Sequence, residues 1–147
     1  MRHLNRELKR IFNNIRFPIG KFHEDQCIIH YIIDRCEKIV VISNILYMYV
    51  QRKDSIMGIP YSIKRFDACD AYIDRYNFLK SKGLYSHAKV SLRGAYGILI
   101  MALKQLDIKL HKEKILPYYK NIFWLLLKMG DLRAVKLFIY RYKRILL

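Results

Sequence analysis

The sequence predicts a mainly α-helical protein with a small β part. Three observations lead to this prediction: apolar residues recur at helical spacing along most of the chain, two short runs are rich in strand formers, and no Ser/Pro/Gly-rich linker divides the 147 residues. The hydrophobic fraction of 53% excludes a disordered basic tail. The length suits one domain of ordinary size.

The N-terminal part, residues 1–60, is expected to contain helices and two strands. Residues 3–14 have the spacing of a short amphipathic helix, which Phe17-Pro-Ile-Gly20 ends. A second helix opens at His23-Glu24-Asp25 and runs to about Arg35, because acidic residues are favoured in a first turn. Lys38–Ser43 is β-branched and apolar in its centre, like a buried strand, and Ile45–Arg52 is predicted as the second strand.

The remaining part, residues 61–147, is expected to be helical throughout. One helix covers 62–82 and ends at Gly83, and another covers about 86–106. Two shorter helices follow, one over about 117–128 with Pro117 in its first turn, and one over 131–146 with Asp131 as N-cap. Two strands alone make a poor sheet, so residues 1–60 are expected to be the end of a larger α/β fold with a helical extension.

The charge of the chain is strongly positive and unevenly distributed. The formal net charge is +16; residues 1–73 carry 12 Lys/Arg and 8 Asp/Glu, whereas residues 74–147 carry 16 and 4. This asymmetry favours an anionic partner for the second half, either nucleic acid or a phospholipid surface. The alternative is a solvated basic face without a dedicated ligand.

The stretch from Asn13 to Met57 carries the most specific pattern. It contains Phe17-Pro-Ile-Gly-Lys-Phe-His-Glu-Asp25 and, after the predicted strand, Leu46-Tyr-Met-Tyr-Val-Gln-Arg-Lys-Asp-Ser-Ile-Met57. Together these segments resemble the second half of bacterial family 2 glycosyltransferases, which build surface polysaccharides. The resemblance implies the C-terminal portion of a GT-A α/β glycosyltransferase domain, followed by a helical tail. It also implies transfer of a sugar from a nucleotide-sugar donor to a glycan or lipid-linked acceptor.

The resemblance assigns roles to single residues. Asp25 matches the general base of inverting members, which removes the proton of the attacking acceptor hydroxyl, and Glu24 is its neighbour. Gln51, Arg52 and Ser55 match a strand-end loop near the donor diphosphate, where a guanidinium pairs well with phosphate oxygens. The structural alternatives are helix capping for Glu24 and Asp25, and an exposed strand-end charge for Arg52.

The chain also departs from this family. A complete enzyme carries an Asp-x-Asp motif for the divalent metal that bridges the donor phosphates, and no Asp-x-Asp occurs in this sequence. No strand-rich half precedes Phe17. We therefore expect a truncated or split enzyme that lacks the donor site, is inactive alone, and binds no cofactor itself. Its partner would be a nucleotide-sugar-binding N-terminal half, and manganese or magnesium would bind in the complete enzyme.

The C-terminal helix, residues 131–146, is expected to contact an anionic membrane surface. One arc carries an apolar stripe, formed by Leu132, Val135, Phe138, Ile139, Tyr142, Ile145 and Leu146. The basic residues of the opposite arc are Arg133, Lys136, Arg141, Lys143 and Arg144. Such a pattern is typical of an interfacial helix, whereas the alternative is a core-packing helix with a solvated basic face.

These observations leave alternative functions open. A small basic helical protein that binds nucleic acid would explain the charge, but it would leave the segment Phe17–Asp25 unexplained, and no helix-turn-helix or zinc-finger pattern is present. Nucleic acid is therefore the weaker candidate partner. A membrane-surface module without chemistry is the third candidate.

Three widely spaced cysteines favour a reducing environment, so we expect a cytoplasmic protein, peripheral on the cytoplasmic face of the membrane.

Overall fold

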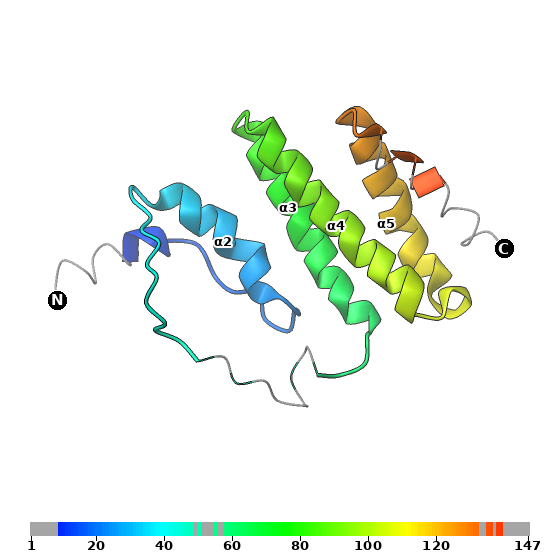
Figure 1. The fold of residues 1–147 in the computed structure, drawn as a ribbon, viewed down its shortest axis with the longest axis horizontal. Helices are drawn as coiled ribbons and strands as arrows, with labels where there is room; N and C mark the ends of the chain where they lie inside the picture. The colour runs from blue at the N-terminus through cyan, green and yellow to red at the C-terminus, as the bar shows by residue number, and fades with distance from the viewer. Residues whose placement is uncertain are drawn as a thin grey trace.

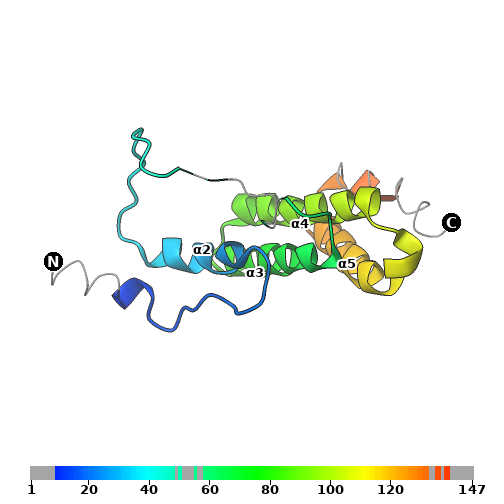
Figure 2. The same cartoon turned by 90° about the horizontal axis from the view of Figure 1, so that it is seen from below.

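The computed structural model describes residues 9–48, 50, 55, 58–132, 135–136 and 138–139. Its helices, in chain order, are α2 (Glu24–Arg35), the 3-10 helix η1 (Ile63–Phe66), α3 (Asp67–Ser81), α4 (Tyr85–Gln105) and α5 (Ile108–Lys128). Helix α2 lies at one side of the molecule and α5 at the other, with α3 and α4 between them (Figures 1 and 2). The residues described contain no β-strand.

The predicted β part, and with it the GT-A α/β portion, is therefore wrong. Residues 38–48 follow α2 as an extended segment that is exposed along its whole length, and Ile45 is 93% exposed. The second predicted strand extends to 51–52, which lie outside the described residues. A strand is stabilised by a hydrogen-bonded neighbour and by burial of its side chains, and no described segment supplies either.

The helix predicted over 23–35 is confirmed, and α2 packs on α3 in parallel. The backbone N–H of Phe22, just before α2, donates to Oδ2 of Asp67 at the start of α3, at 2.9 Å. At the other end, Nζ of Lys82 lies 2.8 Å from Oδ2 of Asp34. Because α2 and α3 are parallel, the end of α2 and the start of α3 lie at opposite ends of this helix pair (Figure 1). Of the helix predicted over 3–14, residues 9–11 are helical and 1–8 lie outside the described residues.

Helices α3 and α4 form an antiparallel hairpin whose turn was correctly predicted at Gly83. This glycine has a φ of 74°, its N–H donates to Lys80 O at 3.0 Å, and the Leu84 N–H donates to Leu79 O at 2.9 Å. This pair of bonds is a Schellman motif, which favours glycine because of the positive φ. The helices predicted over 62–82 and 86–106 are thereby confirmed. The first turn of the 62–82 helix is the 3-10 helix η1.

A close contact between the α3 and α4 helices depends on Gly94. A Cβ atom placed on this residue would lie 2.5 Å from the ring of Tyr72. The same approach lets Ser91 Oγ donate to Tyr72 O at 2.9 Å. Gly97, one turn further along α4, has no atom within 4 Å of such a Cβ.

Helix α5 begins nine residues earlier than predicted. The Asp107 side chain caps it by accepting from the Lys109 N–H at 2.9 Å and the Leu110 N–H at 3.4 Å, and Pro117 lies inside the helix. An internal proline removes one backbone hydrogen bond and costs about 3 kcal/mol. Full burial of Ile115 and near-complete burial of Tyr119, on either side of Pro117, offsets this cost, since each contributes about 1.5–3 kcal/mol.

The core lies between α3, α4 and α5 and extends to the first residues after α5. Its largest fully buried side chains include Tyr76, Leu92, Leu99, Ile122 and Phe138. Gly130 ends α5 with a second Schellman motif, in which the Asp131 N–H donates to Leu126 O at 3.0 Å. The chain is thereby turned so that Phe138 reaches the core.

Candidate functional site between α2, α3 and α4

A groove of about 580 Å³ lies between α2, α3 and the first half of α4. Its walls are mainly apolar: Ile29 and Ile33 come from α2, Phe78 from α3, and Leu84 and Val90 from the start of α4. Ile29, Ile33, Leu84 and Val90 are exposed large apolar residues. A concave apolar surface with few polar groups is the usual form of a ligand site, so this groove is the candidate binding site.

Two hydrogen bonds connect the groove residue Arg75 to Asp25 through Gln26. Nη2 of the groove residue Arg75 donates to Gln26 Oε1 at 3.0 Å and to the Gln26 backbone oxygen at 2.9 Å. The Gln26 side-chain amide then donates to Asp25 Oδ2 at 3.3 Å. Glu24 and Asp25 are exposed in the first turn of α2, where the helix dipole favours negative charge. Asp25 is thus both accessible and connected through Gln26 to the groove.

A buried histidine forms part of the groove wall. His30 is 5% exposed, and its Nε2 lies 3.2 Å from Oδ2 of Asp74, which also accepts from the Tyr31 hydroxyl at 2.9 Å. Burial lowers the pKa of His30, and the nearby Asp74 carboxylate opposes part of this shift. Burial and the bond to Asp74 raise the pKa of Tyr31 to about 12. His30 is therefore favoured as a neutral imidazole.

Sequence reasoning missed most of the groove. The contacts that create it join residues far apart in the chain: His30 with Asp74, and Gln26 with Arg75. His30 could have been noticed, because it lies on the same helix as Ile29 and Ile33, but its spacing from the other histidines gives no metal motif.

The predicted donor loop is only partly described. The Ser55 backbone oxygen accepts from the N–H groups of Gly58 at 2.8 Å and Ile59 at 3.1 Å. Gln51 and Arg52 lie outside the described residues. Their proposed role at the donor diphosphate stays a prediction.

The predicted interfacial stripe of the C-terminal helix is wrong for two of its residues. Val135 and Phe138 are buried in the core, and the Phe138 ring centroid lies 3.9 Å from that of Tyr119. Ile139 and Leu132 are exposed. Phe138 packs inward because aromatic side chains of α4 and α5 surround it. Of the predicted membrane-facing basic residues, Lys136 is exposed. The others, Arg133, Arg141, Lys143 and Arg144, lie outside the described residues.

Asp131 anchors this segment to α4. Its carboxylate is buried and accepts from Arg93 Nε at 2.7 Å, with Lys89 Nζ at 4.0 Å, and its backbone oxygen accepts from the Val135 N–H at 2.9 Å. Asp131 thus occupies the predicted N-cap position and also forms an ion pair, which raises the pKa of Arg93.

Within the described ranges, no three His, Cys, Asp or Glu side chains lie together in a way that could hold a metal ion. No helix among the same residues is long and apolar enough to cross a membrane. No protein-family model, curated protein or solved structure matches this chain.

Proposed function

We propose that the groove binds the acceptor of a glycosyltransferase reaction of the family 2 type, and that Asp25 is the general base. The donor would be a nucleotide sugar, and the acceptor a glycan or lipid-linked glycan of surface polysaccharide synthesis. The observation that carries this proposal is the hydrogen-bonded connection from Arg75 in the groove, through Gln26, to the exposed Asp25 carboxylate. It links the motif residue to a ligand-sized groove through two hydrogen bonds, which supports the proposal.

The chemistry fits these two features. An acceptor hydroxyl attacks the anomeric carbon of the donor sugar, the bond to the nucleoside diphosphate breaks, and Asp25 takes the hydroxyl proton. The apolar walls at Ile29, Ile33 and Val90 suit the lipid portion of a lipid-linked acceptor. Gln26 would orient Asp25, because its amide donates to Oδ2 and is itself fixed by Arg75.

The donor phosphates would be held elsewhere. The described residues offer no cluster that fits a divalent metal, so no catalytic step is assigned to a metal in this part of the chain. We propose that a nucleotide-sugar-binding half completes the enzyme, with Gln51, Arg52 and Ser55 close to the diphosphate. The complete enzyme would act on the cytoplasmic face of the membrane that holds its acceptor.

The test joins this chain to a family 2 nucleotide-sugar-binding half and follows sugar transfer to an alkyl glycoside. Asp25→Asn keeps the size of the side chain but removes its basicity, so kcat is expected to fall by about 10²–10⁴ while donor binding stays unchanged. Glu24→Gln is the matched control, since it removes the adjacent carboxylate, and a clearly smaller loss is expected. Near-full kcat in Asp25→Asn would show that the general base lies elsewhere.

A further inference from the structure

Helix α5 has an outer face that combines exposed apolar and basic residues. Its inner face is buried through Ile115, Tyr119, Ile122 and Leu126. Leu110, Pro117 and Trp124 follow one another at seven-residue intervals, which places them in one stripe on the opposite face. Leu110 is 76% exposed and Trp124 57% exposed, and Leu127 is exposed beside them.

Lysines border this stripe. At about 100° per residue, Lys109 and Lys120 fall on one side of it and Lys114 on the other, while Lys128 lies in line with Leu110 at the C-terminal end of the stripe. All four are exposed, none forms an ion pair with an acidic residue of the described ranges, and Glu113 is the single acidic residue of α5. The outer face therefore combines an apolar stripe with four positive charges and one negative charge, that of Glu113 next to the stripe.

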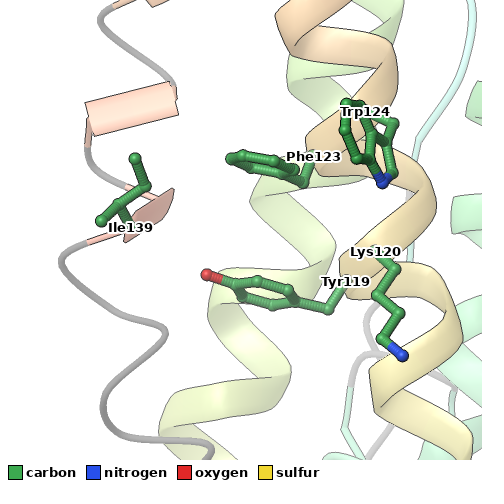
Figure 3. Close-up of a pocket in the computed structure, with 5 residues that line it drawn as sticks. All are labelled: Tyr119, Lys120, Phe123, Trp124 and Ile139. Carbon is green, nitrogen blue, oxygen red and sulfur yellow. The ribbon is translucent and has the colours of Figure 1, made fainter.

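The residues after α5 extend the same surface. Ile139, which is 58% exposed, borders a pocket of about 200 Å³ together with Tyr119, Lys120, Phe123 and Trp124. Tyr119 and Phe123 extend from α5 toward Ile139, while Lys120 and Trp124 lie next to each other on the helix (Figure 3). Lys136 is exposed in this segment and adds a further positive charge.

We propose that this outer face of α5 docks on an anionic phospholipid bilayer, with the helix lying in the plane of the interface. Tryptophan settles at the depth of the lipid headgroups, leucines enter the acyl boundary, and lysines extend to anionic headgroups. Charge complementarity selects this partner, because the lysines that surround the apolar stripe match phosphates. This inference is independent of the acceptor groove, which lies on the far side of α4.

Nucleic acid is the competing anionic partner, and the composition of the face argues against it. Binding to a phosphate backbone uses basic and aromatic side chains, and it gives no role to exposed leucines. Leu110 and Leu127 gain free energy only when an apolar environment removes them from water. The presence of exposed leucines beside the lysines therefore favours a lipid surface.

The experiment uses the fluorescence of Trp124, which is the one tryptophan of the chain. Vesicles of phosphatidylglycerol are expected to shift its emission to shorter wavelength and to carry the full chain in flotation, more weakly at high salt. Vesicles of phosphatidylcholine are expected to do neither. Flotation without a change in Trp124 emission would place the lipid contact outside α5 and overturn the proposal.

Three double variants separate the contributions of the charges and of the apolar side chains. Lys120→Glu/Lys128→Glu is expected to weaken vesicle binding at least about tenfold, because each basic residue near the surface contributes about 1 kcal/mol. Its matched control, Lys80→Glu/Lys104→Glu, makes the same charge change on α3 and α4. This control should bind phosphatidylglycerol vesicles much more tightly than Lys120→Glu/Lys128→Glu does. Leu110→Ser/Leu127→Ser keeps every charge and is also expected to weaken binding; circular dichroism checks its fold.

Two outcomes would overturn the lipid assignment. The first is wild-type binding to phosphatidylglycerol vesicles by Leu110→Ser/Leu127→Ser or by Lys120→Glu/Lys128→Glu. The second is a shift of Trp124 emission by polyuridylate that exceeds the shift by vesicles, which would identify a nucleic-acid surface.

Discussion

Gln26 Oε1 accepts a hydrogen bond of 3.0 Å from Arg75 Nη2, across 49 positions of the sequence. The same guanidinium donates to the Gln26 backbone oxygen, so both main chain and side chain of α2 are held by α3. The Gln26 amide remains free to donate to Asp25. Parallel packing of α2 on α3 thus sets the position of the proposed base relative to the groove.

His30 makes the stability of the protein dependent on pH. Because burial lowers its pKa below the ordinary 6.5, the unfolded chain binds a proton more readily than the folded chain. The free energy of unfolding is therefore expected to decrease as the pH falls from 7.5 to 5, where unfolded His30 becomes charged. In His30→Leu this decrease should be smaller.

Urea unfolding at several pH values measures this effect. His87→Leu is the matched control, because His87 borders the same groove but is exposed. The other groups at His30 are Asp74, Arg75 and Tyr31, all present in both variants. An equal pH dependence in His30→Leu and wild type would show that His30 does not titrate below its ordinary pKa.

Gly94 and Gly97 provide a matched pair within α4. Gly94→Ala places a methyl group 2.5 Å from the Tyr72 ring and is expected to destabilise the protein by about 1–3 kcal/mol. Gly97→Ala meets open space and should stabilise it by about 0.5–1 kcal/mol, as alanine usually does inside a helix. Thermal unfolding measures both. Stabilisation by Gly94→Ala would mean that α3 and α4 do not approach as closely as described.

Ile45 and Ile122 test whether segment 38–48 is buried. Ile45 is almost fully exposed, so Ile45→Ala should change the free energy of unfolding by less than about 0.5 kcal/mol. Ile122 is fully buried, so Ile122→Ala should lower the free energy of unfolding by about 2–5 kcal/mol. Denaturant unfolding of the isolated chain compares the two. Similar losses for both would show that residues 38–48 pack into a core after all.

The isolated chain is expected to bind nucleotide sugars only weakly, with a dissociation constant in the millimolar range or above. A nucleoside diphosphate needs its charge neutralised by a metal or clustered donors, and no Asp-x-Asp motif occurs in the sequence. Isothermal calorimetry with UDP- and GDP-sugars in the presence of manganese tests this. Micromolar binding would contradict the assignment of the donor site to a separate half.

The helices could be predicted because their signals are local. Gly83 ends α3 and the acidic first turn begins α2, and each signal lies within a few residues of the feature it marks. The predicted start of α5 is nine residues too late because proline favours the first turn of a helix, whereas the cap is in fact supplied by Asp107. The prediction of a strand at 38–43 is wrong for a different reason: burial of an apolar segment depends on neighbours that a local pattern cannot supply.

The site was predictable only in part. Asp25 came from a sequence motif, whereas the groove beside it depends on contacts such as Gln26 with Arg75 and His30 with Asp74, which join α2 to α3. Nothing in the spacing of these residues along a single sequence pairs them. The same holds for Phe138, whose burial against Tyr119 follows from the turn at Gly130.

The acceptor groove is tested most directly by isoleucine methyl NMR of the full chain, titrated with dodecyl maltoside below its critical micelle concentration. Ile29 and Ile33 report on the groove, and Ile139 reports on the α5 surface. Shifts are expected at Ile29 and Ile33, and they should be much weaker in Val90→Asp, which places a charge in the groove wall. Shifts confined to Ile139, or equal shifts in Val90→Asp and wild type, would contradict the proposed acceptor site.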